Sequence, residues 1–461
     1  LKQSGCKRAA LTPVSFYRLP KTQAQPELRP VGIGFGPAGM FAALVLALAG
    51  LQPIVLERGE DASTRHEKGK AFFESGKLDT RSNVQFGEGG AGTFSDGKLN
   101  TGVNNPRIGW ILERFVEFGA REEILFDAKP HVGTDVLLNV VQNLRKRIVS
   151  LGGEVRFCAQ VTKLCTQDGR ITGVQLQDGE MIPCSNAILA VGHSARDTFD
   201  ALLQMGISME PKPFSMGVRI EHLQSDIDNA CFGDFAGHER LGHAEYHLSD
   251  TSSGRGVYTF CMCPGGVVMP SSSEEGGVVT NGMSNFARDE CNANAALIAQ
   301  VRQSDFGAEH PLAGVEFQRK LERAAYLAGG ADYHAPAQTV GDFLRGRASD
   351  GWGKVTPSYA AGTNFADLNS ILPVGVCDSL KLAIVDMDRR LKGFADPEAV
   401  LTGVESRTSS PVRIERDDDL QSVSVKGLFP CGEGAGYAGG ITSAAADGLR
   451  VAEKLFSLFS L

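Results

Sequence analysis

Glycine constrains this chain more than any other residue, because it is both abundant and clustered. The sequence holds 55 glycines in 461 residues, well above the average usage of about 7%. Three clusters follow the spacing GxGxxG, and they begin at Gly34, Gly87 and Gly434. Glycine permits tight turns and the close approach of a backbone to a ligand. The clusters therefore predict where the chain turns sharply and where it binds something.

The first cluster lies inside a recognisable order of predicted elements. Apolar residues from Val31 predict a strand, Met40 to Leu48 predict a helix, and Pro53 to Leu56 predict a second strand that Glu57 closes. A strand, a glycine turn, a helix and a second strand ending in an acid are together typical of a dinucleotide site, where the acid hydrogen-bonds a ribose. A glycine turn without a ligand is the alternative, and the full context argues against it.

The residue types of this first turn suit a pyrophosphate. Gly34, Gly36 and Gly39 allow the tight turn, the close approach of the backbone to the pyrophosphate, and the packing of helix against strand. Pro37 and Ala38 precede the predicted helix, and the N–H groups of a helix N-terminus bind anions. We therefore expect all five residues to contact the cofactor.

The second cluster runs from Gly87 to Gly92 and has no second βαβ unit around it. It opens no predicted helix, so it does not predict another dinucleotide site. The whole segment 59–105 is polar and long for a connection, which favours a ligand-binding role over a plain flexible loop. Its N–H groups suit a phosphate or the edge of an isoalloxazine ring. The expected contacts here are Gly89, Gly90, Gly92 and Thr93.

The third cluster joins a predicted strand, Gly427 to Cys431, to a predicted closing helix, Ile441 to Leu458. The N-terminus of that helix would stabilise the negative charge that a reduced flavin develops at its N1–C2=O edge. A merely structural turn is the alternative at this position.

Between the second and third clusters, the pattern predicts further elements. An amphipathic helix spans Leu137 to Leu151, and short strands at Val155 to Leu164, Ile171 to Leu176 and Met181 to Pro183 are separated by Asp-Gly turns. Ala187 to Val191 predicts a buried strand. From about 205 to 410 the pattern mixes strands and helices without a βαβ rhythm.

Charge and composition exclude several classes of protein. A formal charge of −8 and a pI near 5.7 give no basic field for nucleic acid, and we expect a small-molecule partner. No apolar stretch is long enough for a membrane span. The cysteines show no CxxC and no spacing for zinc, so we expect no metal and a cytoplasmic location.

Six strings across the chain resemble a family of FAD-dependent dehydrogenases within the glutathione-reductase-like flavoprotein superfamily. They are NVQFGEGGAGTFSDGKL, KPHVGTD, TFCMCPGG, EEGGVVTNGMSNFARD, GVESRTSSPVRI and GLFPCGEGAGYAGGITSAAADG, beginning at Asn83, Lys129, Thr259, Glu274, Gly403 and Gly427. The resemblance implies FAD as the cofactor. It also implies that Glu57 and Arg58 bind the ADP half and that the Val161 backbone meets the adenine. The other implied contacts are Ala190 and Gly192 over the FAD, Gly432 and Glu433 at the ribityl chain, and Gly440, Ile441 and Thr442 at the pyrimidine ring.

The predicted fold class is α/β. A Rossmann-type FAD-binding domain, with a parallel sheet and a β-meander, would comprise residues 30–204 and 411–461, and an inserted α+β substrate domain would comprise 205–410. Residues 1–29 are expected to form a tail or the remnant of a preceding segment.

The expected activity is two-electron hydride transfer between flavin N5 and an unidentified small molecule, with NAD(P)H as a candidate electron donor. A flavin-dependent monooxygenase and a non-catalytic flavin-binding redox protein are the alternatives. Cys261 and Cys263 would lie on one face of a strand as a redox pair, or would simply be buried apolar residues. Lys98 and Arg407 are candidates for binding an anionic substrate. His193 borders a motif, but a lone histidine is more often structural.

Overall fold

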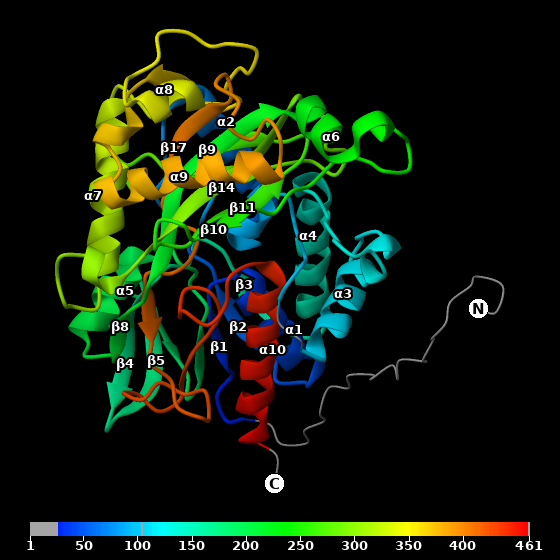
Figure 1. Cartoon of the computed structure of the whole chain (residues 1–461). Helices are drawn as coiled ribbons and strands as arrows, with labels where there is room; N and C mark the ends of the chain where they lie inside the picture. The colour runs from blue at the N-terminus through cyan, green and yellow to red at the C-terminus, as the bar shows by residue number, and fades with distance from the viewer. Residues whose placement is uncertain (1–25, 103–104, 460–461) are drawn as a thin grey trace.

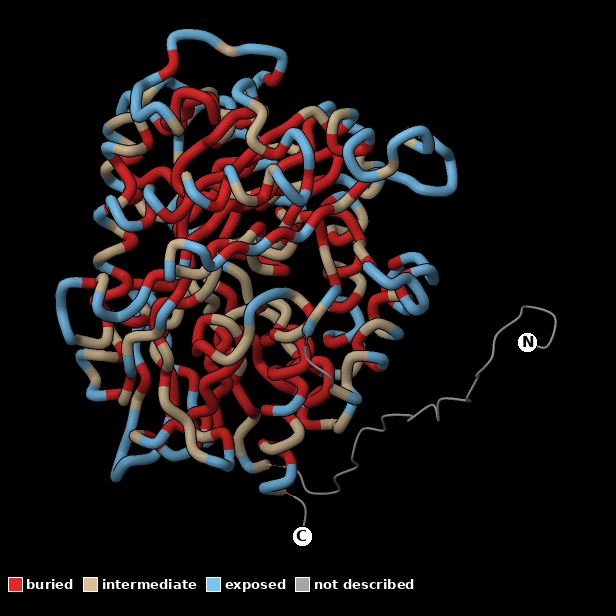
Figure 2. The backbone as a smooth tube through the Cα atoms, in the orientation of Figure 1, coloured by how far each residue is buried: buried red, intermediate tan, exposed pale blue. Residues whose placement is uncertain are grey.

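The structure is a computed structural model that describes residues 26–102 and 105–459. Most of the predicted N-terminal segment, residues 1–29, therefore lies outside the described residues. The chain forms a mixed α/β structure with a parallel sheet at its lower end in Figure 1 and a mostly antiparallel sheet above it. Figure 2 shows buried backbone running through both regions.

The parallel sheet has five strands. In spatial order they are β19 (Leu428–Pro430), β7 (Ala187–Leu189), β1 (Val31–Ile33), β2 (Ile54–Leu56) and β3 (Glu154–Arg156). Side chains alternate between its two faces: Val31 and Ile33 point into one core, whereas Val55 and Ile188 point into the other. The sheet is thus covered on both sides, as parallel sheets usually are.

Helices cover one face of this sheet. They are α1 (Pro37–Leu48), α3 (Arg107–Glu117), α4 (Thr134–Ser150) and α10 (Ile441–Ser457). Residues 38–47 of α1 are all buried, because this helix packs against α4, α10 and the sheet at once. Figure 1 shows α10, in red, beside α1, although the two helices lie at opposite ends of the chain.

An antiparallel meander covers the other face, together with α5 (Arg196–Gln204). Its strands are β4 (Val161–Gln167), β5 (Arg170–Leu176) and β6 (Met181–Pro183). The meander confirms the predicted Asp-Gly hairpins. The single strand predicted from Val155 to Leu164 is wrong, because the chain leaves the parallel sheet after Arg156, and Cys158 takes a positive φ of 54° before β4 begins.

The segment 59–105 contains more regular structure than predicted. It includes α2 (Ala62–Ser75), which Asp61 caps, and a 3₁₀ helix η1 (Gly90–Phe94). The expectation that the second glycine cluster opens no helix is therefore wrong, because Gly89, in the left-handed region, turns the chain into η1.

The second large sheet has seven strands. In order they are β10 (Ser249–Asp250), β11 (Val257–Cys263), β14 (Asn292–Val301), β9 (Phe214–Leu223), β17 (Val400–Glu405), β15 (Ala335–Thr339) and β16 (Thr363–Phe365). The remaining helices are α6 (Gln224–Phe232), α7 (Ala313–Ala328), α8 (Val340–Arg345) and α9 (Val374–Arg390). Short 3₁₀ helices also occur. They are η2 (Glu122–Leu125), which follows α3, and η3 (Gly233–Phe235), η4 (Gln303–Asp305) and η5 (Leu368–Ser370), which lie between the elements of the second sheet.

Two small strand pairs complete the fold. β12 (Val267–Pro270) and β13 (Thr280–Met283) form a hairpin beside the seven-stranded sheet. β8 (Met209–Pro211) pairs with β18 (Val412–Ile414), so the chain enters and leaves the seven-stranded region through neighbouring strands. No helix among the described residues is long and apolar enough to cross a membrane.

Candidate cofactor and substrate site

The first glycine turn connects β1 to α1, and its three glycines meet different surroundings. Gly34 has a φ of +98°, and a Cβ there would lie 2.4 Å from the Ala190 carbonyl oxygen. A Cβ on Gly39 would lie 2.0 Å from the Gly34 carbonyl oxygen. A Cβ on Gly36 would meet only the Cα of Gly90, at 3.7 Å. Packing therefore requires glycine at the first and third positions, whereas the middle glycine keeps a space open.

That open space lies at the N-terminus of α1. Gly36 is the N-cap, Pro37 begins the helix, and among the described residues no side chain caps the first turn. The N–H groups and the positive end of the helix dipole are thus free of side-chain acceptors, as a phosphate site requires.

Glu57 is buried at the end of β2, and backbone donors hold its carboxylate. It accepts hydrogen bonds from the N–H groups of Phe35 at 2.7 Å, Gly59 at 2.9 Å and Gly87 at 3.0 Å. A carboxylate offers about four acceptor positions, so a ribose hydroxyl would be a further donor. Glu57 thereby ties the first glycine turn to the second.

The second glycine cluster is held rigidly by one buried arginine. The Arg65 guanidinium donates to the carbonyl oxygens of Asn83 at 2.6 Å and Glu88 at 2.8 Å, and to the Thr93 hydroxyl at 2.8 Å. Burial lowers the pKa of Arg65 to about 10. These bonds contradict a plain flexible loop, because they fix the backbone that leads into Gly90.

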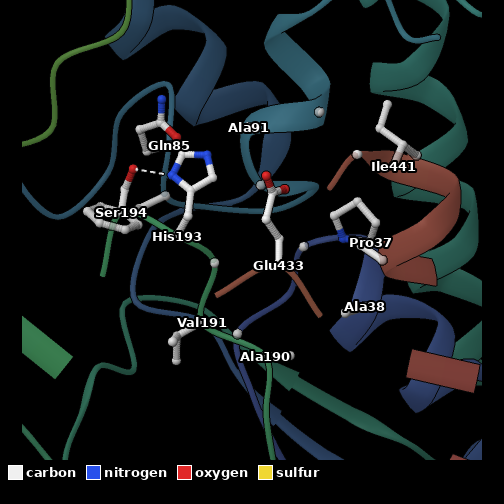
Figure 3. Close-up of a pocket in the computed structure, with 18 of the residues that line it drawn as sticks. Pro37, Ala38, Gln85, Ala91, Ala190, Val191, His193, Ser194, Glu433 and Ile441 are labelled. Atoms are coloured by element: carbon white, nitrogen blue, oxygen red, sulfur yellow. Dashed lines mark hydrogen bonds between the residues drawn. The ribbon is translucent and has the colours of Figure 1, made fainter. Parts of the chain in front are cut away.

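The third glycine cluster leads from β19 into α10. Gly440 is the N-cap of α10 with a φ of +121°, and a Cβ there would meet nothing within 4 Å. Glu433 lies earlier in the cluster, and burial raises the pKa of its carboxyl group to about 7. Figure 3 shows Glu433 pointing into the same cavity that Pro37 and Ile441 line.

All three clusters open onto one cavity of about 420 Å³, within the range of sites for small molecules and cofactors. The predicted cofactor residues that line it are Gly34, Gly36, Pro37, Ala38, Glu57, Arg58, Gly90, Gly92, Val161, Ala190, Gly192, Glu433, Gly440 and Ile441. A Cβ on Gly192 or Gly440 would meet nothing within 4 Å. The open glycines, the uncapped helix N-terminus and the cavity fit a dinucleotide cofactor.

Five other predicted contacts lie outside the lining of this cavity and support its wall. They are Gly39, Gly89, Thr93, Gly432 and Thr442. A Cβ on Gly89 would lie 2.3 Å from Thr93, and one on Gly432 would lie 2.7 Å from Ala38. The Thr442 hydroxyl donates to the Leu99 carbonyl oxygen at 2.8 Å. These residues pack one turn against another, and their direct contact with the cofactor stays a prediction.

Lys98 and Arg407 line the cavity, as the prediction of a ligand role requires. The Lys98 ammonium donates to the Met262 carbonyl oxygen. The Arg407 guanidinium is more fully occupied, since it binds both oxygens of Glu322, at 3.0 and 2.7 Å, and donates to Ser194 at 3.1 Å. Arg407 thus contributes charge to the wall but has few donors left for a substrate.

The two cysteines do not share one face toward the cavity, so that prediction is wrong. A bulge in β11 breaks the alternation, and Cys261 has a φ of +43°. Cys261 lines the cavity, whereas Cys263 is buried outside its lining. The Cys263 thiol hydrogen-bonds to Cys261 and, with help from Arg219 and Lys98, lowers the pKa of Cys261 to about 6 against the cost of burial.

Sequence reasoning gave His193 little weight and did not single out Asn281 or Glu405, yet all three line the cavity. The His193 ring lies 3.0 Å from the Ser194 hydroxyl, as Figure 3 shows. Burial, with Arg407 and Arg196 nearby, lowers the pKa of His193 to about 3. His193 is therefore neutral at physiological pH. The position of His193 directly after Gly192, a predicted cofactor contact, could have indicated that it lines the cavity.

The fold and this cavity define a class: an α/β protein with a parallel sheet whose glycine turns line a cofactor-sized site. Residues 213–408 match the family described as "FAD-dependent protein, C-terminal domain-like". A Clostridium beijerinckii protein, described as uncharacterized, is 49% identical over 435 residues, which cover 94% of this chain and 81% of that protein.

The chain therefore belongs to this family of FAD-dependent proteins, and FAD is its cofactor. Among solved structures, a geranylgeranyl bacteriochlorophyll reductase-like protein of Thermoplasma acidophilum is 12% identical with a TM-score of 0.41, covering 95% of this chain and 81% of that one. Glycine oxidase of Bacillus cereus is 12% identical with a TM-score of 0.36, covering 94% of this chain and 96% of that one.

Proposed function

We propose that this protein is an FAD-dependent oxidoreductase of the glutathione-reductase-like superfamily that transfers a hydride between FAD and a small molecule. In this proposal residues 30–204 and 411–461 form a Rossmann-type FAD-binding domain, and 205–410 form the substrate domain. The observation that carries it is that the lining of one cavity combines the three glycine clusters with residues of β11, β13 and β17.

The ADP half of FAD would lie along the first turn. The N–H groups after Gly36 would bind the pyrophosphate, Glu57 and Arg58 would hold the ribose, and the Val161 backbone would meet the adenine. Two contacts hold the Arg58 side chain at this position: its guanidinium lies 4.4 Å from the centre of the Phe86 ring, and it donates a hydrogen bond to Asp197.

The flavin half would lie between the second and third clusters. Gly90, Gly92, Gly440 and Ile441 all line the cavity, and the two clusters meet there, since a Cβ on Gly92 would lie 3.1 Å from the Ile441 side chain. The N-terminus of α10 would stabilise negative charge at the ring edge. When bound, FAD would supply hydride transfer at N5, and the residues of the chain would position the ring and exclude water.

Glu433 and His193 are the candidate proton carriers of this cavity. A carboxyl group with a pKa near 7 exchanges protons at physiological pH more readily than an ordinary one. The neutral His193 ring can both donate and accept a hydrogen bond. We propose that they hold or pass protons beside the flavin, while the Cys261 thiol faces the substrate.

Anaerobic reduction tests the proposal. NADH and NADPH are added separately to the FAD-loaded protein under argon, and the flavin absorbance near 450 nm is followed. We expect bleaching with at least one of them, followed by reoxidation by a two-electron acceptor. Labelled oxygen supplied during turnover should not enter the organic product. Label in that product would favour a monooxygenase, and the absence of turnover with any donor and acceptor would favour a non-catalytic redox protein.

A further inference from the structure

Arg219 of β9 is a fully buried residue that the proposed reaction does not use directly. All of its N–H groups find acceptors. Its Nε and Nη2 bind the two oxygens of Glu405 at 2.9 and 3.1 Å, and Nη2 also donates to Asn281 Oδ1 at 2.9 Å. Its Nη1 donates to the Cys261 carbonyl oxygen at 2.9 Å and to Asn294 Oδ1 at 3.1 Å.

Three of these acceptors line the cavity, although Arg219 does not. Cys261 comes from β11, Asn281 from β13 and Glu405 from β17. Burial alone would lower the pKa of Arg219, but the Glu405 carboxylate, together with Cys263 and Cys261, outweighs burial and raises it. Arg219 is therefore a permanent cation that fixes the relative positions of three strands at the cavity wall.

The bonds to Asn281 determine which way its amide faces. Asn281 Oδ1 accepts from Arg219 and also from the Gly282 N–H at 2.8 Å. Two donors at one atom identify that atom as the oxygen. Within the described residues no hydrogen-bond acceptor is assigned to the Asn281 NH₂ group, and the residue lines the cavity. Its two N–H bonds are thus available to a ligand.

Lys98 supports the same part of the wall. Its ammonium donates to the Met262 carbonyl oxygen, and Arg219 donates to the carbonyl oxygen of the preceding residue, Cys261. The two cations therefore fasten one bulge through consecutive peptide groups, and both act electrostatically on the Cys261 thiol. The Lys98 ammonium also lies 3.7 Å from carboxylate oxygens of Asp96 and Glu245, and Arg288 binds both of these carboxylates at 2.7 Å. Since Arg219 is paired with Glu405, these three carboxylates each have an arginine partner, and the wall presents an ammonium and an amide donor to a ligand.

We infer that this wall is a subsite for a carboxylate group of the substrate, bound by the Asn281 NH₂ and the Lys98 ammonium, with Arg219 as the positioning residue behind them. The inference rests on the proposed function, because it places the carboxylate in the cavity that would hold the flavin. A carboxylate suits this pair, since a charge-assisted hydrogen bond is about twice as strong as a neutral one. The substrate class is thus a small carboxylic acid.

The test compares acids with their neutral amides. The FAD-loaded protein is titrated with acetate, benzoate and phenylacetate, and with the three corresponding amides, while flavin absorbance and calorimetric heat are both recorded. We expect saturable binding of at least one acid, with its amide at least about 10-fold weaker. Equal binding of acid and amide, or no binding of any acid, would overturn the inference.

Variants locate the binding. Asn281→Asp keeps an acceptor for Arg219 and Gly282 but adds a negative charge, and Lys98→Met removes the ammonium. Each should weaken binding of the acid by about 10- to 100-fold, whereas Asn229→Asp, the same exchange at an exposed residue of α6, should not. Unchanged affinity in Asn281→Asp would refute the subsite. The outcomes remain separable, because a protein that binds acids but shows no redox turnover contradicts only the proposed function.

Discussion

The two walls of the cavity are built in opposite ways. The wall from the parallel sheet is rich in glycines that expose backbone N–H groups, such as those at Gly36 and Gly440, beside the side chains of Glu57 and Glu433. The wall from the seven-stranded sheet is made of charged and amide side chains held in buried networks, centred on Arg219 and Arg407. Backbone suits a pyrophosphate, which is the same in every FAD, whereas side chains can be matched to a particular substrate.

A second buried network extends the side-chain wall toward α5. Glu322 of α7 binds Arg407 on one side and Arg196 on the other, with distances of 2.7 Å to each. Burial would raise the pKa of Glu322, but the two arginines outweigh it and hold that pKa well below its usual range. This network joins α5 to the seven-stranded region.

The largest expected effect concerns the first glycine turn, where Gly36 and Gly39 have different roles. In Gly36→Val the new Cβ would meet only the Cα of Gly90, at 3.7 Å, so the fold should survive while the pyrophosphate position is filled. We expect FAD affinity to fall by at least about 100-fold, since the anion-binding N–H groups are no longer accessible. Flavin content and circular dichroism measure the two properties separately.

Gly39→Val is the matched control for this prediction. Its Cβ would lie 2.0 Å from the Gly34 carbonyl oxygen, so this variant should lose the fold as well as the flavin. A folded Gly36→Val protein with normal FAD content would remove the basis of the assignment.

A substitution in the buried side-chain network should lower the stability of the fold. Glu322→Gln leaves Arg196 and Arg407 without their shared carboxylate, and breaking a buried pair from one side costs about 3–5 kcal/mol. The free energy of unfolding in urea should fall by that amount. Asp386→Asn, which breaks the exposed ion pairs of Asp386 with Arg389 and Arg390, should change it by less than about 1 kcal/mol. Similar losses in both variants would contradict the contrast.

A smaller effect concerns the reactivity of Cys261. Its pKa of about 6 means that its thiolate forms as pH rises through 6, so its alkylation by iodoacetamide should reach half its maximal rate near pH 6. Burial raises the pKa of the Cys231 thiol instead, so its rate should still be rising at pH 9. Peptide mass spectrometry separates the two sites. A Cys261 rate that follows that of Cys231 would show that the Cys263 hydrogen bond, with Arg219 and Lys98, does not lower the pKa of this thiol.

Local patterns predicted the backbone wall well. The strand, turn and helix around Gly34 to Gly39, the meander and α10 all follow from residues adjacent in sequence. Helix α2 was missed although it has ordinary signals, since Asp61 caps its start and Gly76 ends it in the left-handed region. The helix has no clear apolar periodicity in the sequence, because it buries only four residues, Ala62, Arg65, Gly69 and Phe72.

The side-chain wall was largely beyond local reasoning. Arg219 and Glu405 are 186 residues apart in sequence, and their pairing depends on β9 and β17 lying side by side in the sheet. The bulge that separates the roles of Cys261 and Cys263 arises from the pairing of β11 with β14. Strand alternation alone predicted the wrong face, because it contains no information about such a bulge.

The identity and amount of the bound flavin test the central claim most directly. The purified protein, after incubation with FAD and removal of the excess, is denatured in acid, and the released flavin is identified by chromatography and mass spectrometry. The account predicts one FAD per chain, because the first glycine turn and Glu57 provide for an adenine dinucleotide. Recovery of FMN, or of no flavin from folded protein, would contradict it.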